Sequence, residues 1–196
     1  MNVPTETASL KGDNSALVIE GRDLRLTVLG RDDVTADYLS WLNDPHVLRF
    51  RTPKTFPMTM SQLKSWIEGI PASGDLVLAI RTKIGRRHIG NIALGTIQPK
   101  HRSAELSVMI GARDIWGLGY GTQAITLVTG YAFEAMSLRR LWAESPNPAF
   151  NQVVRKLGWI AEGIKREAFL LDGAYLDFEC WSLLDREWQA GKGRLK

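Results

Sequence analysis

"IWGLGYGTQAITLVTGYAF", residues 115–133, places glycines at positions 117, 119 and 121 directly before a long apolar run. The first N–H groups of a helix have no partner within it, and together with the helix dipole they bind anions such as phosphate. Glycine allows the backbone to approach a diphosphate closely, so the stretch is predicted to hold phosphate. The spacing of its apolar residues predicts that the helix is buried: Ala124, Ile125, Leu127, Val128, Tyr131, Ala132, Phe133 and Ala135.

The three glycines could also form a flexible turn or belong to one of the common nucleotide-binding motifs. A dinucleotide-binding fingerprint would have a glycine where Thr122 stands and a parallel β-α-β unit around it. A P-loop would have Gly-Lys-Ser or Gly-Lys-Thr, and neither tripeptide occurs in the chain. Both motifs are therefore disfavoured.

The size and charge of the chain limit its domain organisation and its partners. With 196 residues, 44% of them hydrophobic, one core is expected. We expect a disordered leader over residues 1–15, a single domain over 16–190 and a basic tail over 191–196. The net charge is +4, and the 25 lysines and arginines are scattered, so the charge fits an anionic small ligand as well as nucleic acid. Nucleic-acid binding is a third alternative, and no nucleic-acid partner is predicted.

Cysteine, histidine and apolar-run patterns set the expected compartment and exclude some chemistry. Cys180 is the only cysteine, so no internal disulfide can form, which favours a cytoplasmic protein. His46, His88 and His101 lie in different segments without metal-like spacing, and no metal is predicted. No run approaches the ~20 apolar residues of a membrane span, so we expect a soluble protein.

The remaining segments predict a mixed α/β fold with a mostly antiparallel sheet. Residues 24–30 have strand composition; a helix is expected over 31–44, ended by Pro45, and another over 60–70 with Ser61 as its cap. Strands over 76–82, 88–98 and 103–111 predict an antiparallel meander. After the glycines we expect a helix of about 15 residues, a strand over 138–145, a helix over 149–158 and a hairpin within 162–184 that turns at Asp172-Gly173.

"MIGARDIWGLGYGTQAI", residues 109–125, resembles motif A of the GNAT superfamily, the acetyl-CoA-dependent N-acetyltransferases. Gly119 and Gly121 fill the glycine positions of that motif. Trp116 stands where Gln or Arg is usual, as in the branch of ribosomal-protein N-terminal acetyltransferases and sugar-amine acetyltransferases. "HIGNIALG", "AELSVMIG" and "NPAFNQVVRKLGWIAEG" are also similar to that branch. The resemblance implies a GNAT-like fold: a twisted, mostly antiparallel sheet of about six or seven strands flanked by about four helices.

The resemblance also implies acetyl-CoA as the cosubstrate and assigns the residues that would hold it. The backbone of the strand ending at Ile110 would run beside the pantetheine arm, and a strand N–H would polarise the thioester carbonyl. Asn147 matches the asparagine that contacts the pantetheine or an active-site water, although it could equally cap a helix. The implied cofactor contacts are Val108, Met109, Ile110, Trp116, Gly117, Leu118, Gly119, Tyr120, Gly121, Thr122 and Asn147.

Three residues are the candidates for the acid-base chemistry: Glu105, Asn147 and Tyr175. A glutamate on this strand often serves as general base in the family, which implies that role for Glu105; pairing with Arg102 or Lys100 is the alternative. The family's usual Ser and Tyr proton donors correspond to Phe150 and Val154 here, so the general acid is left open. Tyr175, beside Asp177 on the predicted hairpin, is a secondary candidate, with a sheet-surface position as the alternative.

The acceptor site is expected along residues 41–56, which resemble the acceptor wall of acetyltransferases acting on amino sugars and protein amino termini. Trp41, Arg49 and Arg51, with Glu105, are the candidate acceptor contacts; Lys54 could join the arginines on the phosphates of a nucleotide-linked sugar. Core packing of Trp41 and solvated surface positions of the cations are the alternatives.

These patterns predict an N-acetyltransferase that moves an acetyl group directly from acetyl-CoA to a primary amine. A small molecule such as a nucleotide-linked amino sugar is narrowly favoured over a protein amino terminus. A CoA-binding sensor domain without catalysis is a further alternative, favoured by Phe150 and Val154 and disfavoured by Glu105 and Asn147. A homodimer is left open.

Overall fold

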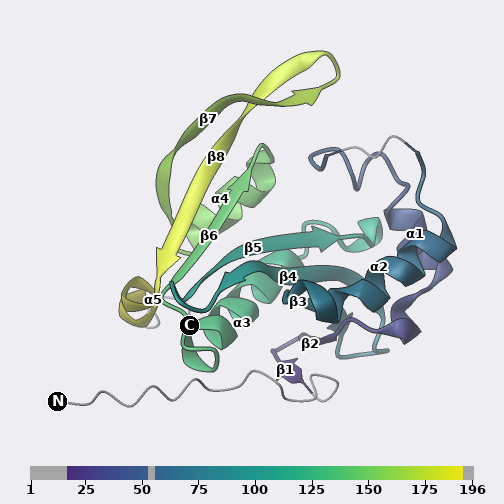
Figure 1. Cartoon of the computed structure of the whole chain (residues 1–196), viewed down its shortest axis with the longest axis horizontal. Coiled ribbons are helices and arrows are strands. Elements are labelled where there is room, and N and C mark those ends of the chain that lie inside the picture. Colours follow the sequence, from purple (N-terminus) through teal and green to yellow (C-terminus); the bar gives the residue numbers. More distant parts are fainter. Residues whose placement is uncertain (1–16, 53–55, 192–196) are drawn as a thin grey trace.

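The computed structural model describes residues 17–52 and 56–191, and within them the chain forms one eight-stranded sheet (Figure 1). The leader expected over 1–15 and the tail residues 192–196 lie outside the described residues. In spatial order the strands are β1 (Val18–Glu20), β2 (Leu24–Val28), β3 (Leu76–Thr82), β4 (His88–Gln98), β5 (Ser103–Ile110), β6 (Arg140–Ser145), β8 (Ala174–Leu184) and β7 (Ile160–Leu171).

All neighbouring strands are antiparallel except β5 and β6, and this parallel pair is short. Only Ser103–Glu105 pair with Arg140–Trp142, although β5 continues to Ile110 and β6 to Ser145. Beyond these three pairs the two strands diverge, as Figure 1 shows. The divergence opens the middle of the sheet on the carboxyl-terminal side of Glu105.

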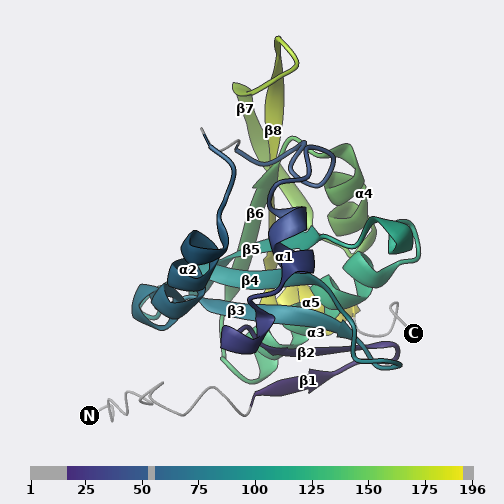
Figure 2. The same ribbon diagram turned by 90° about the vertical axis from the view of Figure 1, so that its right-hand side faces the viewer.

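The helices cover the two faces of the sheet (Figure 2). Adjacent residues of a strand point to opposite faces. Ile110 lies under α3 (Tyr120–Glu134), whereas a Cβ at the following Gly111 would meet the Trp41 ring of α1 (Ala36–Trp41) within 2.1 Å. α2 (Met60–Ser73) packs with α1, and α4 (Pro148–Lys156) lies on the α3 face, where Asn151 accepts from Trp181 Nε1 at 3.2 Å.

The core is formed where these helices meet the central strands. Residues 76–80 of β3 are all buried, as expected for a central strand that is covered on both faces. α3 buries Ala124, Ile125 and Val128 against the sheet, and α2 buries Leu63 and Ile67. Each fully buried aliphatic side chain contributes about 1.5–3 kcal/mol. The start of α3 is therefore fixed in place by the packing of its own buried turns.

The first predicted helix is two shorter elements, so the prediction of one helix over 31–44 is wrong. Arg31–Asp33 form a 3-10 turn, and α1 begins after Thr35, whose hydroxyl accepts from Tyr38 N at 3.2 Å. The break occurs because Asp33 is buried and paired with Arg81. Because α1 already ends at Trp41, Pro45 is not what ends it.

The second predicted helix is capped by a different residue from the one expected. Thr59, not Ser61, is the N-cap of α2: its hydroxyl accepts from Gln62 N at 3.3 Å, and Gln62 Oε1 accepts from Thr59 N at 2.8 Å. This is a capping box. The helix also continues past Pro71 to Ser73, and its C-cap is Gly74, whose φ of 78° suits glycine.

The rest of the predicted order is confirmed, with two additions. β3 and β4 have the predicted bounds, the meander is antiparallel, and Asp172-Gly173 turns the hairpin. β1 and the helix α5 (Asp185–Gly191) were not predicted, which brings the described residues to eight strands and five α-helices. No helix in the described part of the chain is long and apolar enough to cross a membrane.

Candidate active site

The start of α3 leaves three backbone donors without partners inside the helix. Its N-cap is Gly119, and no side chain caps the helix. The first helical hydrogen bond runs from Gln123 N to Gly119 O at 3.0 Å. The N–H groups of Tyr120, Gly121 and Thr122 precede that bond, so the helix itself cannot satisfy them. Because the first turn contains no acidic residue, the positive end of the helix dipole is not neutralised by its own side chains.

The three glycines of the opening stretch meet different requirements. Gly117 and Gly119 have φ values of 80° and 82°, in the left-handed region that other residues avoid. Gly121 is not among the glycines with positive φ, and a Cβ added there would lie 3.7 Å from Ile110 Cγ1, an ordinary contact. The backbone conformation therefore explains glycine at positions 117 and 119. The fold would accept a side chain at Gly121, so it does not explain why the start of α3 lacks one there.

Trp116 and Arg113 connect this loop to its neighbours. Trp116, 45% exposed, donates from Nε1 to the Ile110 carbonyl at 2.9 Å. The Arg113 guanidinium lies 5.9 Å from the centre of the Trp116 ring and 3.3 Å from Asp44 of the α1–α2 loop. The glycine loop is therefore linked both to the end of β5 and to the segment expected to form the acceptor wall.

β5 presents its free edge to the opening beside β6. Gly111 N donates to Ile89 O of the adjacent chain segment at 2.9 Å, so by the two-residue alternation the peptide groups of Met109 face β4, and those of Val108 and Ile110 face the opening. The Val108 carbonyl accepts from Arg51 Nη1 at 3.4 Å. Of the three predicted pantetheine contacts on β5, Val108 and Ile110 have backbone groups aimed at the opening, whereas Met109 does not.

Glu105 lies at the point where β5 and β6 separate. It is the last residue of β5 that pairs with β6, opposite Trp142, and its Oε2 is 3.5 Å from Thr96 Oγ1. Burial, and the negative charge of nearby Glu144, raise the pKa of Glu105 above that of an ordinary glutamate. Arg102 does not pair with it in the way the sequence left open, because its Nε donates to Ser137 O at 2.7 Å.

Thr96 reaches Glu105 because β4 contains a bulge at this position. The register between β4 and β5 shifts between Gly95 and Gln98, and Thr96 has a φ of 49°. Bulges re-aim side chains in this way. Asp75 fixes the bulge by accepting from Thr96 N at 3.0 Å. Sequence reasoning missed both residues, since no local signal marked the bulge.

Asn147 and its neighbours have structural roles in α4. Asn147 is the N-cap of that helix, and its Oδ1 accepts from Ala149 N at 3.0 Å. Capping, one of the two roles considered for Asn147, is therefore observed, and the side-chain amide group is left to donate elsewhere. Val154 is fully buried, and Phe150 packs against the core. Neither position supplies a proton donor.

Tyr175 lies near the tip of the hairpin, away from the divergence of β5 and β6. It pairs with Leu170, is 64% exposed, and is seven residues from Ser182, the residue aligned with Trp142 and Glu105, or about 23 Å along β8. Asp177, its predicted companion, accepts from Glu167 N at 2.7 Å, where the register between β7 and β8 shifts. The structure therefore does not bring Tyr175 together with Glu105.

The three predicted acceptor contacts in the first half of the chain have separate positions. Trp41 is only 8% exposed and packs against the rings of Tyr38 and His88, so it belongs to the core. Arg49 lies 3.6 Å from Asp172 at the tip of the hairpin. Arg51 contacts the Val108 carbonyl at the free edge of β5. Lys54 lies outside the described residues.

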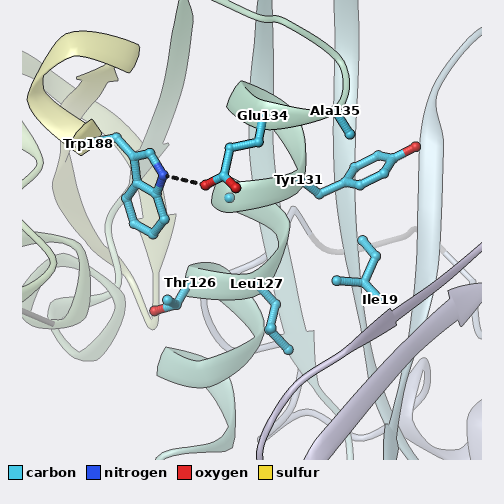
Figure 3. A pocket seen from close by; sticks show the side chains of 8 residues that line it. Ile19, Thr126, Leu127, Tyr131, Glu134, Ala135 and Trp188 are labelled. Carbon is cyan, nitrogen blue, oxygen red and sulfur yellow. Dashed lines mark hydrogen bonds between the residues drawn. The ribbon is translucent and has the colours of Figure 1, made fainter. Parts of the chain in front are cut away.

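A separate open pocket of about 420 Å³ lies beside the later turns of α3 (Figure 3). There Trp188 of α5 donates from Nε1 to Glu134 Oε1 at 3.2 Å, and Ile19, Leu127 and Tyr131 provide apolar walls. The pocket contains none of the predicted site residues. It is on the α3 face, whereas the side chain of Glu105 is on the α1 face.

The combined arrangement is a donor-rich helix start at one end of an open strand edge and a carboxylate with a raised pKa at the other. The helix start can bind an anion, the edge can hydrogen-bond an extended chain containing amides, and the carboxylate can accept a proton. These are the requirements for binding a long anionic thioester and deprotonating an amine beside it.

Known proteins and solved structures are similar to this chain over most of its length. The model of the acetyltransferase (GNAT) domain family matches residues 23–160. The uncharacterized N-acetyltransferase YoaA of Bacillus subtilis is 28% identical over 173 residues, which cover 85% of this chain and 96% of that protein. Spermidine N-acetyltransferase from Vibrio cholerae, solved with CoA and spermine, has a TM-score of 0.77 at 21% identity, covering 85% of this chain and 98% of that one. Ribosomal-protein-S5-alanine acetyltransferase from Vibrio fischeri has a TM-score of 0.75 at 17% identity, covering 88% and 98%.

Proposed function

This chain belongs to the GNAT acetyltransferase family, and on that premise we propose that it transfers an acetyl group from acetyl-CoA directly to the primary amine of a small molecule. The observation that supports this most is the opening between β5 and β6, with the uncapped start of α3 on one side and Glu105 at its vertex. The start of α3 would then serve the binding of acetyl-CoA, and Glu105 the deprotonation of the amine.

The residues present fit acetyl-CoA. Three N–H groups at the start of α3 suit its diphosphate, because they have no helical partner and no side chain occupies their position. The backbone groups of Val108 and Ile110 at the strand edge suit the amides of its pantetheine arm. On binding, the arm would replace Arg51 at the Val108 carbonyl and Trp116 at the Ile110 carbonyl. When bound, acetyl-CoA supplies the acetyl thioester that the amine attacks.

Glu105 is the group proposed to accept the proton of the amine. An amine must be neutral to attack a carbonyl, and alkyl amines are protonated at neutral pH. A glutamate with a raised pKa is a stronger base than an ordinary one, yet it is still ionised when its pKa lies below the working pH. The proton passes from the amine, directly or through one water, to Glu105 Oε and then to solvent.

Direct transfer is proposed because Cys180, the only thiol of the chain that could carry the acetyl group, lies in β8 rather than on β5 or at the start of α3. Cys180 aligns with Glu144 of β6, on the same face of the sheet as Glu105. Cys180 is far from the glycine loop in the sequence, but the register of the sheet places it closer to the opening than that separation suggests. Cys180→Ser is expected to keep turnover within about twofold; loss of turnover together with an initial burst of CoA release would instead indicate an acetyl-cysteine intermediate.

The choice of a small amine rests on an arginine beside the tip of the β7–β8 hairpin. Glu105 and Glu144 attract any cationic amine, a protein amino terminus included, and so do not decide between the two acceptors. Arg49 is 56% exposed in its contact with Asp172, so its guanidinium could exchange that partner for a phosphate of a nucleotide-linked amino sugar. A protein amino terminus is the alternative acceptor, because the sequence resembles the branch that includes enzymes with such substrates.

The test measures thiol release from acetyl-CoA against a panel of nucleotide-linked amino sugars, polyamines and short peptides. We expect release with at least one small amine, and a loss of about 10²- to 10⁴-fold in kcat for Glu105→Gln. Glu20→Gln, on the edge strand β1, is the matched control and should retain full activity. Release only with peptides would identify the alternative acceptor. Acetyl-CoA binding without release from any amine would favour the sensor.

The pH dependence provides a second check. Because burial raises the pKa of Glu105, kcat/KM should rise with pH through a value above that of an ordinary glutamate and then level off. The folded protein binds the proton of Glu105 more tightly than the unfolded chain does, so the contribution of Glu105 to stability is lost as the pH rises through its folded pKa. Glu105→Gln should therefore unfold at a higher temperature than the wild type at pH 7, despite its low activity.

A further inference from the structure

Three charged side chains from three different strands lie on one face of the sheet beside the opening. Glu105 of β5 aligns with Trp142 of β6, and Glu144, two residues on, points to the same face as Trp142. Glu144 aligns with Cys180 of β8, which aligns with Gly163 of β7, and Lys165 is two residues beyond Gly163. By this register the side chains of Glu105, Glu144 and Lys165 share the face that carries α1 and α2.

Lys165 forms an ion pair with Glu144 across the intervening strand. The contact joins Lys165 Nζ to Glu144 Oε2, and the two side chains are 57% and 28% exposed. The lysine thus reaches diagonally over β8 from the outermost strand of the sheet. The β7–β8 hairpin that carries it extends beyond the rest of the sheet in Figure 1. The positive charge next to Glu144 therefore comes from β7, a strand that has no part in the proposed binding of acetyl-CoA.

We propose that Glu144 and Lys165 are positioning residues that set the proton affinity of Glu105, with Glu144 increasing it and Lys165 limiting that increase. The proposal rests on the proposed function, in which Glu105 is the base. Glu144 is two residues beyond Trp142, the residue opposite Glu105, and on the same face of the sheet, so its charge disfavours a second negative charge at Glu105. Lys165 offsets part of that effect by pairing with Glu144 rather than with Glu105.

Two other groups act on Glu105: Thr96 more strongly than Lys165, and Asp75 more weakly. Thr96 of β4 lies 3.5 Å from its Oε2 and stabilises the ionised form, and Asp75, beside the β4 bulge, adds a weaker repulsion. The raised pKa of Glu105 agrees, since burial is its largest cause and Glu144 the next, with Lys165 acting in the opposite direction. The distinctive consequence is that removing the two partners should have effects of opposite sign.

The test follows the carboxyl carbon of Glu105 by NMR during a pH titration of the full chain without ligands, with the signal assigned by its loss in Glu105→Gln. Glu144→Gln should lower the Glu105 midpoint relative to wild type, because it removes a negative neighbour. Lys165→Met should raise it, because Glu144 is then unpaired. Lys165→Arg should leave it near the wild-type value, and the double variant Glu144→Gln/Lys165→Met should fall between the two single variants.

A matched control exists at the opposite edge of the sheet, where Lys83 pairs with Glu20 at 3.6 Å. Glu20→Gln and Lys83→Met make the same chemical changes far from Glu105 and should leave its midpoint unchanged. If Glu144→Gln and Lys165→Met move the midpoint in the same direction, or neither moves it, the proposal is overturned. Shifts as large in the control variants would also overturn it.

The same variants extend the test to catalysis. The acid limb of kcat/KM should move with the NMR midpoint, and each pH unit of displacement changes the rate on that limb about tenfold. A merely structural role would alter the rate at all pH values without moving the limb. The outcomes separate the two hypotheses: an unmoved limb in active variants contradicts this proposal alone, whereas a wild-type chain that acetylates no amine contradicts the proposed function.

Discussion

Helices α3 and α4 lie on the same face of the sheet, but their first turns differ: only α4 has a capping side chain. α4 begins at Asn147, whose side chain accepts from Ala149 N, and Pro148 fills its first position, where no N–H is needed. α2 likewise begins with the Thr59–Gln62 capping box. α3 begins at a left-handed glycine with no capping side chain.

The difference shows where the chain satisfies its own backbone and where it leaves donors for another molecule. A cap contributes about 1 kcal/mol, and α3 forgoes it although it is the longest helix of the described residues. Packing compensates, because α3 is held by six buried residues along its length. A helix secured by its core can leave its first turn open, whereas the shorter α4 depends more on its cap.

Among variants at the helix starts, the largest expected effect comes from adding a charge to the open start of α3. Gly119→Asp and Gly119→Asn introduce side chains of nearly the same shape, and both residues tolerate the left-handed conformation better than most others. Only the aspartate repels a diphosphate. Calorimetric titration with acetyl-CoA should show at least about tenfold weaker binding for Asp than for Asn, a difference that decreases with added salt. Equal affinities of the two variants would mean that the diphosphate is not at this helix start.

The next largest effect is expected when the N-caps of α2 and α4 are removed. Asn147→Ala and Thr59→Ala should each lower the free energy of unfolding by about 1 kcal/mol, measured by urea denaturation. Neither should change acetyl-CoA affinity if capping is the only role of these residues. Weaker binding in Asn147→Ala but not in Thr59→Ala would show that the free amide group of Asn147 contacts the cofactor, the second role considered for it.

The smallest effect distinguishes Gly121 from a glycine later in the same helix. Gly121→Ala and Gly130→Ala both place a Cβ in ordinary contact distance, 3.7 Å from Ile110 and 3.5 Å from Trp188. Each should stabilise α3 by about 0.5 kcal/mol in thermal unfolding. Only Gly121→Ala should weaken acetyl-CoA binding. Were Gly130→Ala to weaken it equally, the loss could not be ascribed to the open first turn.

The sequence predicted the parts of the fold that depend on local pattern. The apolar spacing after Gly121 predicted a buried α3, the β-rich runs over 76–82 and 88–98 between turn segments predicted β3 and β4 to the residue, and Asp172-Gly173 predicted the hairpin turn. Cap choice was predicted less well, because Thr59 and Ser61 both fit locally. Gln62 decides for Thr59 by completing the capping box.

The sequence singled out candidate site residues only where they share one segment, and their roles stay predictions. The glycine loop and Glu105 lie within 18 residues of one another in the sequence and have recognisable patterns. Glu144 and Lys165 approach Glu105 only through the register of β5, β6, β8 and β7, which the sequence does not encode locally. Trp41 is the opposite case. It lies in the segment expected to contact the acceptor, but it packs against Gly111 and the His88 ring in the core.

The most direct test of the central claim is a crystal structure of the chain with CoA. The account predicts that the diphosphate oxygens lie within hydrogen-bonding distance of the N–H groups of Tyr120, Gly121 and Thr122, with the pantetheine arm along the free edge of β5. A structure in which the diphosphate binds elsewhere while these three N–H groups face solvent would contradict it.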